Sequence, residues 1–263
     1  HSFLKRSENK IVPVLGSDSK VGHRIPVAKY IQQIENPIIY YSGYKLNKEF
    51  GWILGAYLAD GCAMKSNGMI CISKVHNVFE KNIRAFTDEH GLSYRVKNTK
   101  GDINNKTYYG KDHIFNSKTL TKFLLDNFET GSYNKTIPGW VFFSNLEFIS
   151  GIISGFWDGD GYIHAQKCNI RAHSVNKKLI NDFCKLLAYF NIFGVLLEQK
   201  RDRTQSKYPG NYEVLYELNI PRKYAKLFKE NIGLQTDYKS EALDTIIHYN
   251  YKLFNKTGKF KEE

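Results

Sequence analysis

Two aspartates, Asp60 and Asp160, are the residues whose types and spacing most clearly indicate chemistry. Each lies at the end of a run of small and apolar residues and precedes a glycine, in Phe50–Gly61 (FGWILGAYLADG) and Ile149–Gly161 (ISGIISGFWDGDG). The two runs align without a gap, and their aspartates are 100 residues apart. A single Asp-Gly pair is an ordinary turn signal. Its duplication after matched runs predicts two carboxylates that act together, and carboxylate oxygens are ligands that suit Mg²⁺.

Two helices must position these aspartates. Gly55 and Ala59, like Gly155 and Gly159, are four residues apart and therefore lie on one helical face. Small residues at such positions allow two helix backbones to approach closely, although glycine within a helix costs about 1 kcal/mol relative to alanine. We therefore expect these four residues to form the interface between the helices. Such packing would also bring the two C-terminal helix ends together.

The ends of the two helices predict a metal site. An anion at a helix C-terminus is disfavoured by about 0.3–1 kcal/mol, and two neighbouring carboxylates repel each other. Divalent cations between them would offset both effects, so we expect two or more Mg²⁺ ions, held by Asp60 and Asp160 with the adjoining Gly61 and Gly161. The two glycines are also expected to end their helices as C′ residues, where a left-handed backbone favours glycine.

The similarity between the two halves continues beyond these helices. After each aspartate the pattern predicts two strands, a helix, two strands and a helix. In the first half these elements are 62–65, 69–73, 78–90, 92–98, 107–116 and 117–128. In the second half they are 162–165, 169–174, 176–191, 195–203, 212–220 and 222–231. The repeat predicts a pseudo-symmetric α+β protein with halves at 45–144 and 145–263, after an N-terminal segment at 1–44.

At this point the sequence resembles a known family. Ile53–Gly61 (ILGAYLADG) and Ile153–Gly161 (ISGFWDGDG) resemble the two motifs of a monomeric LAGLIDADG homing endonuclease, and the resemblance extends over about residues 45–255. Leu58 departs from the family name, which has Asp there. The resemblance implies two αββαββα halves that meet at the motif helices, with two antiparallel sheets forming a saddle on double-stranded DNA. It also implies that Asp60 and Asp160 ligate the catalytic Mg²⁺ ions.

The activity implied by this resemblance is site-specific cleavage of both DNA strands. Metal-activated water would hydrolyse one phosphodiester bond in each strand of a long asymmetric target and leave 3′ overhangs. Two alternatives remain open: an RNA-splicing maturase of the same fold, and a catalytically silent DNA-binding module. Retention of Asp60, Asp160 and Lys135 favours the nuclease.

Two lysines are the further catalytic candidates. Lys135 begins the run Lys135–Pro138 (KTIP), which resembles the K-x-I-P element of two-motif family members, whose lysine reaches the active site. Lys239 is its counterpart in the repeat, because each lysine follows the third helix of its half by the same number of residues. A lysine near a metal-bound phosphate could stabilise developing negative charge or help to activate water. A solvated surface position is the alternative for both.

The charge of the chain favours a polyanionic partner. Its 38 Lys and Arg residues against 26 Asp and Glu residues give a net charge of +12, and cations that neutralise phosphates release counterions on binding. Strands expose alternate side chains, and a two-stranded ribbon fits the major groove, where Arg or Lys reads guanine and Asn or Gln reads adenine. The expected DNA contacts are Lys65, Asn67, Lys74, Arg95, Lys97, Lys100, Lys111, Asn169, Arg171, His173, Lys200, Arg201, Arg203 and Lys207.

The first thirty residues carry a second resemblance. The runs 1–4, 11–14 and 21–30 resemble the part of an intein splicing domain that starts at its block-B histidine, here His1. The chain would then be the endonuclease region of an intein, excised from a host protein. The nucleophile block and the C-terminal His-Asn block have no match, so this chain alone is not expected to splice. A short β-rich arm that adds a DNA contact is the alternative.

Other classes of protein are disfavoured. No apolar run approaches the ~18 residues that span a bilayer, and the first residues do not resemble a signal peptide. The four cysteines form no C-x-x-C pair, so reduced thiols are expected rather than a zinc ribbon or a disulfide framework. We expect an intracellular monomer, in the nucleus or cytoplasm with its target DNA.

Overall fold

The structure is a computed structural model that describes residues 2–26, 34–103, 106–200 and 214–248. The chain divides into two units, residues 1–33 and 34–263. In the smaller unit, β1 (Ser2–Ser7) pairs antiparallel with β2 (Lys10–Leu15), and a 3₁₀ turn follows at Gly16–Asp18. Residues 34–44, which the sequence interpretation assigned to the N-terminal segment, lie in the larger unit.

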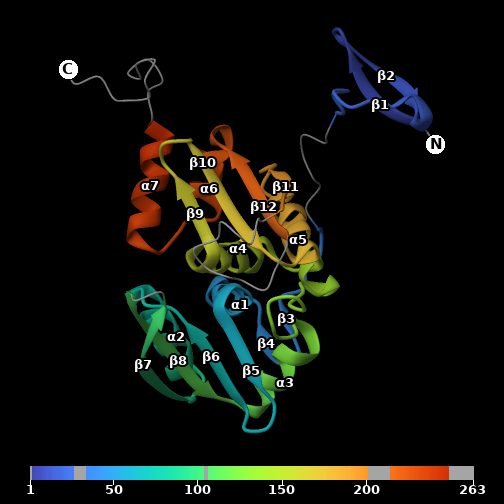
Figure 1. Ribbon diagram of the computed structural model, residues 1–263. Coiled ribbons are helices and arrows are strands. Elements are labelled where there is room, and N and C mark those ends of the chain that lie inside the picture. The colour runs from blue at the N-terminus through green and yellow to red at the C-terminus, as the bar shows by residue number, and fades with distance from the viewer. Residues whose placement is uncertain (1, 27–33, 104–105, 201–213, 249–263) are drawn as a thin grey trace. The chain divides into compact units, whose positions relative to one another are not determined.

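Two helices form the centre of the larger unit. Helix α1 (Lys48–Asp60) and helix α4 (Leu146–Asp160) lie side by side (Figure 1). Each begins at an asparagine whose side chain accepts a hydrogen bond from the third helical residue: Asn47 from the Phe50 amide at 2.9 Å and Asn145 from the Phe148 amide at 2.8 Å. Nearly all of both helices is buried, which explains why their sequences are apolar on every face.

Each central helix leads directly into a four-stranded antiparallel sheet. The first sheet has the order β5-β6-β8-β7 and the second the order β11-β12-β10-β9. The strands of the first sheet are β5 (Gly61–Met64), β6 (Met69–Ser73), β7 (Ser93–Ile103) and β8 (Lys106–Asn116). Those of the second are β9 (Gly161–His164), β10 (Asn169–Ser174), β11 (Val195–Lys200) and β12 (Val214–Pro221).

The remaining helices complete the repeat. They are α2 (Asn77–Glu89), α3 (Lys118–Asn127), α5 (Lys177–Ala188), α6 (Ala225–Asn231) and α7 (Asp237–His248). The predicted α+β class and the αββαββα order of both halves are confirmed. Helix α7 was not among the predicted elements.

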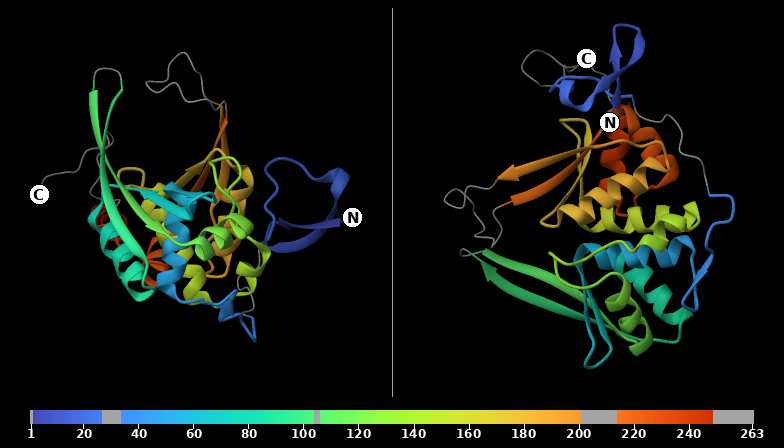
Figure 2. Two further views of the ribbon diagram at one scale, coloured as in Figure 1. Left: turned by 90° about the horizontal axis from the view of Figure 1, so that it is seen from below. Right: turned by 90° about the vertical axis from the view of Figure 1, so that its right-hand side faces the viewer.

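The sheets bury alternate residues, as the strand period requires. Ile70 and Ile72 on β6, and Ile170 and Ala172 on β10, are fully buried against the helices. Both sheets extend to the same side of the α1–α4 pair (Figure 2). Their opposite faces therefore point away from the core, and these are the faces where DNA contacts are predicted.

A hairpin before α1 packs against the segment that joins the two halves. Strands β3 (Tyr40–Tyr41) and β4 (Tyr44–Lys45) pair with each other, and a 3₁₀ helix covers Gly139–Phe143. Tyr41 stacks on Trp140 with ring centroids 4.1 Å apart, and Tyr44 stacks on Phe50 at 4.9 Å. Among the described residues, no helix is long and apolar enough to cross a membrane.

Candidate active site

The contact between α1 and α4 leaves no room for side chains at its centre. A Cβ atom on Gly55 would lie 2.1 Å from the Ile152 carbonyl oxygen, and one on Gly155 would lie 2.1 Å from that of Trp52. A Cβ on Gly159 would lie 2.4 Å from the Cβ of Ala59. The four residues predicted for the helix interface therefore lie in the contact, and space requires glycine at three of them, Gly55, Gly155 and Gly159.

Two further glycines in this contact were not among the predicted residues. A Cβ on Gly51 would lie 2.3 Å from the Phe148 carbonyl oxygen, and one on Gly151 would lie 2.2 Å from that of Lys48. Both precede the predicted glycines by four residues, so the helical period could have identified them.

The helix pair brings the two motif aspartates together. The position of a Gly159 Cβ lies 3.3 Å from Asp60 Oδ2, so the Asp60 carboxylate lies against the end of the opposite helix. Burial and, to a smaller extent, the charge of Asp60 raise the pKa of Asp160 to about 6. Lys74 donates to Asp60 Oδ2 at 2.5 Å. Lys74, predicted as a DNA contact, thus belongs to the carboxylate centre.

The glycines after the aspartates correct one expectation. Gly61 has φ −90° and ψ 153°, and Gly161 has φ −74° and ψ 151°, so both are extended rather than left-handed. Each begins a strand instead of closing a C-cap loop. A Cβ would lie 2.4 Å from Tyr57 Cδ2 at Gly61 and 2.5 Å from Trp157 Cδ1 at Gly161. Glycine is needed here because the strand turns back against an aromatic ring of its own helix.

The two predicted lysines bind the last turns of the helices that carry the aspartates, and they occupy equivalent positions in the two halves. Lys135 Nζ donates to the carbonyl oxygens of Tyr57, Leu58 and Ala59 at 2.7, 3.1 and 3.2 Å. The ammonium therefore binds the last turn of α1, where the helix dipole places partial negative charge.

Lys239 makes the same set of contacts in the second half. Its Nζ donates to the carbonyl oxygens of Trp157, Asp158 and Gly159 at 2.8, 2.7 and 3.1 Å. Burial lowers the pKa of Lys239 and that of Lys135 to about 8. Lys135 is 4% exposed and Lys239 3%, so neither is a solvated surface lysine. These ammonium groups offset the unfavourable charge that the aspartates bring to their helix ends.

Asp158 is a polar residue of the site that the sequence interpretation did not single out. This fully buried carboxylate accepts from Trp52 Nε1 at 2.8 Å and from the backbone amides of Gln235 and Thr236, and so connects the two halves. The same position of the first motif is Leu58. The signal that could have identified Asp158 is its place in the motif, where the family name has an acidic residue.

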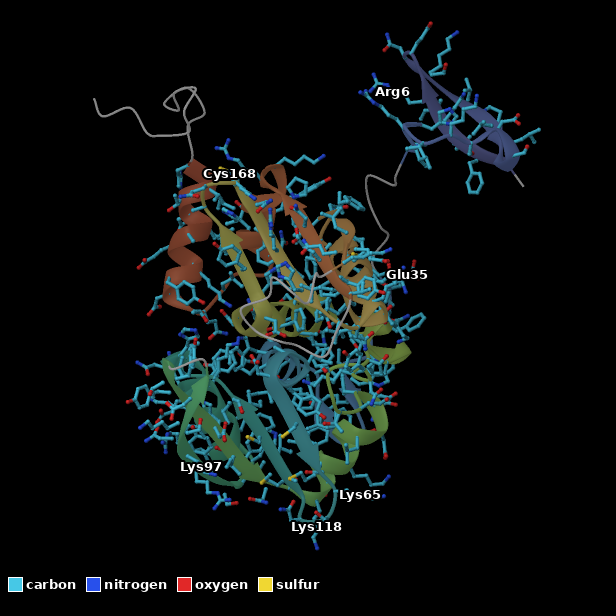
Figure 3. All side chains as sticks on the ribbon, in the orientation of Figure 1. Arg6, Glu35, Lys65, Lys97, Lys118 and Cys168 are labelled. Carbon is cyan, nitrogen blue, oxygen red and sulfur yellow. The ribbon has the colours of Figure 1, made fainter. Side chains whose placement is uncertain are left out.

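The predicted DNA contacts fall into three groups. Six are exposed on the first and second sheets or their turns, with Lys65 and Lys97 visible on the outside of the first half (Figure 3). They are Lys65, Asn67, Arg95, Lys97, Lys100 and Lys200. Lys111 is half-buried and pairs with Glu80 at 3.5 Å. Asn169, Arg171 and His173 are also half-buried on β10. Arg201, Arg203 and Lys207 lie outside the described residues, as does His1.

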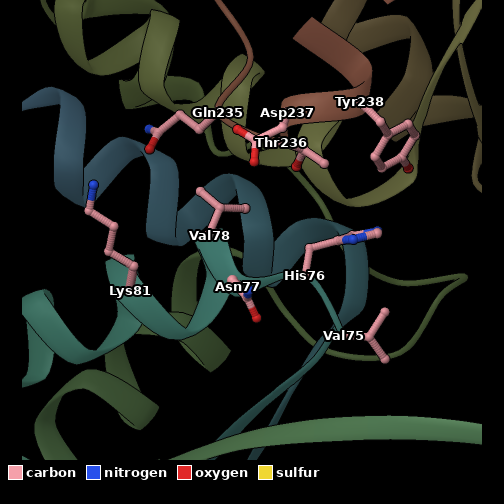
Figure 4. Close-up of a pocket in the computed structure, with 9 residues that line it drawn as sticks. All are labelled: Val75, His76, Asn77, Val78, Lys81, Gln235, Thr236, Asp237 and Tyr238. Carbon is pink, nitrogen blue, oxygen red and sulfur yellow. The ribbon is translucent and has the colours of Figure 1, made fainter. Parts of the chain in front are cut away.

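Two cavities flank the helix ends in pseudo-symmetric positions. One of about 630 Å³ lies between residues 75–78 of the first half and residues 235–238, which include the start of α7 and immediately precede Lys239 (Figure 4). The other, of about 230 Å³, lies between residues 173–175 and the loop of Lys135, and Asp160 lines it. Each cavity thus joins a strand end of one half to the lysine-bearing segment of the other.

The donor set at the helix ends fits Mg²⁺. This ion binds one or two carboxylates and otherwise keeps waters and substrate phosphate. The described residues contain no cluster of three or more His, Cys, Asp or Glu side chains that could hold a metal. Burial and the charge of Asp60 raise the pKa of Asp160, so its ionised form is disfavoured and a divalent cation there would stabilise it. Lys74 already places one positive charge beside Asp60.

The packed helices, the matched aspartates and the two sheets agree with the two-half arrangement that the LAGLIDADG resemblance implies. Residues 147–233 match the family described as the LAGLIDADG-like domain. The fold is that of I-DmoI in complex with DNA and Ca (TM-score 0.52, 16% identity, 76% of this chain and 98% of that chain). It is also that of the homing endonuclease I-WcaI bound to its DNA recognition sequence (TM-score 0.51, 15% identity, 75% and 88%). The resemblance to LAGLIDADG homing endonucleases is therefore confirmed.

The chain is similar to parts of two much longer proteins. The chain is 35% identical over 276 residues to the DNA-directed RNA polymerase subunit Rpo1C of Methanocaldococcus jannaschii, covering 94% of this chain and 30% of that protein. It is 29% identical over 186 residues to the probable translation initiation factor IF-2 of the same organism, covering 69% and 15%. The chain thus spans less than a third of either relative.

Proposed function

We propose that this chain is a site-specific double-strand DNA endonuclease. The observation that carries the proposal is the pair of aspartates, Asp60 and Asp160, at the ends of two helices that touch through glycine. Each helix end is held by its own buried lysine, Lys135 or Lys239. A protein that used one carboxylate would not need two matched helix ends. Cleavage of double-stranded DNA requires hydrolysis of one phosphodiester bond in each strand, which accounts for two.

The roles of the residues follow from their positions. Asp60 and Asp160, with the adjoining Gly61 and Gly161, would hold two or more Mg²⁺ ions, which supply Lewis-acid stabilisation and lower the pKa of water at the scissile phosphate. Lys135 and Lys239 act as positioning residues, because their ammonium groups contact the helix backbone and fix where each carboxylate lies. Lys74 stabilises the Asp60 carboxylate directly.

The two halves would serve the two strands. A monomer with pseudo-two-fold symmetry presents two similar but non-identical sites, so it suits a long asymmetric target. The outward faces of the sheets carry exposed cations such as Arg95 and Lys97, which supports binding along the major groove. By resemblance to the family, the products carry 3′ overhangs. Such a protein would act in the cytoplasm or nucleus, where its target DNA lies.

The relatives support an intein origin. The matched segment occurs within proteins of unrelated names, an RNA polymerase subunit and a translation initiation factor, and covers 30% and 15% of them. A segment shared by such different proteins is expected of an element inserted into host genes. Residues 2–26, which begin with a hairpin, are then the remnant of the splicing domain.

The experiment that tests the proposed function is a selection for cleaved sites. The chain is incubated with a library of randomised double-stranded DNA and Mg²⁺, and cut molecules are captured by their ends and sequenced. A single long asymmetric site with staggered ends is the expected result. Selection of bound but uncut DNA would favour the silent DNA-binding module, and preference for structured RNA would favour the maturase.

A further inference from the structure

A buried carboxylate lies on the outward face of the second sheet. Glu217 is at the centre of β12 and is 2% exposed. Its register partners are His173 on β10 and Leu197 on β11. The adjacent Leu218 is fully buried on the opposite, core-facing side. Since side chains alternate along a strand, Glu217 lies on the face predicted to contact DNA, covered by its neighbours there.

Three donors from two neighbouring strands converge on one oxygen of this carboxylate. Gln199 Nε2 lies 2.6 Å from Glu217 Oε2, His173 Nε2 lies at 2.9 Å and Arg171 Nη1 at 3.5 Å. The Arg171 Nε group also donates to Asn169 Oδ1 at 3.0 Å. The cluster therefore includes all three β10 residues predicted as DNA contacts.

Stability alone does not account for this arrangement. Burying a carboxylate costs several kcal/mol, and replacing a buried ion pair by apolar residues of similar volume is often neutral or stabilising. Leu215 and Leu197 are apolar residues on the same face, so an apolar side chain could be accommodated next to them. The charge at Glu217 is therefore explained better by what it holds in place.

The side chains held by Glu217 are of the kinds that read bases. Arginine pairs with guanine O6 and N7, and glutamine pairs with adenine N6 and N7. A guanidinium has five N–H donors, so the two bonds that Arg171 makes to Glu217 and Asn169 leave capacity for a base edge. Ordering such long side chains before binding reduces the entropy lost when DNA arrives.

We propose that Glu217 is a positioning residue for base recognition, which fixes Arg171, His173 and Gln199 for one half of the target. The proposal rests on the proposed DNA-cleaving function. The first sheet has a simpler counterpart at the same register, where Ser73 donates to Asp112 Oδ1 at 2.6 Å without an arginine. Glu217 should therefore govern specificity only in the half-site that contacts the second sheet.

The test compares specificity profiles of the full chain and its variants. Glu217→Ala should lose discrimination by about ten-fold at two or three neighbouring base pairs in one half-site. Discrimination in the other half-site should stay near wild type. Glu217→Gln, which retains the shape and one acceptor oxygen, should lose less. Glu198→Ala is the matched control, because Glu198 is an exposed acid of the adjacent strand that pairs with Lys177 at 3.7 Å.

Two readouts separate the possible failures. Profiles are measured for cleavage with Mg²⁺ and for binding by selection of bound DNA with Ca²⁺. A wild-type chain that selects no cleaved site would contradict the proposed function. The second failure is a wild-type specificity profile that Glu217→Ala reproduces, or that Glu217→Ala weakens equally at every base pair of the target. Either result would show that the positioning role is wrong. If Glu217→Ala does not fold, the profile of Glu217→Gln decides, by the same criteria.

Discussion

At the scale of single residues, the candidate site depends on ammonium groups placed behind and beside its carboxylates. Lys135 and Lys239 donate to the last carbonyls of α1 and α4, whereas Lys74 pairs with Asp60. A buried ammonium is unfavourable unless it is bonded. Three carbonyl acceptors for each lysine satisfy this requirement and, at the same time, fix the helix ends that carry the aspartates.

Removing one of these helix-end ammonium groups should cost both stability and activity. Lys135→Met leaves three backbone carbonyls without this donor, so we expect the free energy of unfolding to fall by about 1–3 kcal/mol. Cleavage should slow because the end of α1 is no longer fixed. Urea unfolding checks the first effect. Lys122→Met, at an exposed lysine of α3, is the control and should change stability by less than about 0.5 kcal/mol. Equal losses in the two variants would contradict the capping role.

Lys74 should act on one DNA strand only. The corresponding position of the second half is Ser174, since each residue lies two positions after the strand partner of the glycine that follows the aspartate, Ile72 for Gly61 and Ala172 for Gly161. Lys74→Met should slow cleavage of one strand on the order of 10²-fold and leave the other strand nearly unaffected, so nicked DNA accumulates. Labelling the end of each strand separately measures the two cleavage rates. Lys65→Met, at a predicted DNA contact, is the control. Equal slowing of both strands would show that Lys74 acts on binding.

At the scale of elements, the contact between α1 and α4 leaves no room for a side chain at its glycine positions. Gly155→Ala places a Cβ 2.1 Å from the Trp52 carbonyl oxygen, and backbone atoms of a packed helix cannot move aside cheaply. The free energy of unfolding should fall by about 3 kcal/mol. Gly139→Ala, where a Cβ would meet nothing within 4 Å, should change stability by less than about 0.5 kcal/mol. Denaturant unfolding of both variants measures these free energies. Similar stabilities of Gly155→Ala and Gly139→Ala would show that the two helices can move apart.

The elements could be predicted from sequence where the pattern alternates clearly. Strand and helix periodicity identified the αββαββα order of both halves. Helix α7 was missed because the buried residues of its face include Lys239 as well as Leu243 and Ile246, and a lysine counts as polar in any hydrophobic pattern. The extended backbone of Gly61 was also not predictable, since it depends on the position of the Tyr57 ring.

The site was predictable to a similar depth. Duplication identified Asp60 and Asp160, the K-x-I-P resemblance identified Lys135, and the repeat then identified Lys239. The structure brings all four to the two helix ends. Their contacts were not predictable, because a lysine that binds backbone carbonyls leaves no trace in the types of its partners. The Glu217 cluster required the register between β10, β11 and β12, which the sequence does not define.

At the scale of the whole molecule, the excess of positive charge is placed around a small acidic centre. Net charge +12 and exposed lysines on both sheets predict DNA binding dominated by phosphate contacts. Six to ten such contacts would reduce affinity by about 10³–10⁵ between 50 and 200 mM salt. Fluorescence anisotropy with labelled target DNA, in Ca²⁺ to prevent cutting, measures the slope. A flat dependence on salt would be inconsistent with sheets that track the phosphate backbone.

The most direct measurement is double-strand cleavage of the selected target by Asp60→Asn and Asp160→Asn in Mg²⁺. Asparagine retains the size of aspartate but removes the charge that a divalent cation requires. Each variant should lose double-strand cleavage, with DNA affinity in Ca²⁺ within about three-fold of wild type, because the sheet faces proposed to bind DNA are unchanged. Double-strand cleavage at near wild-type rates by either variant would contradict the assignment of the paired helix-end carboxylates as the metal site.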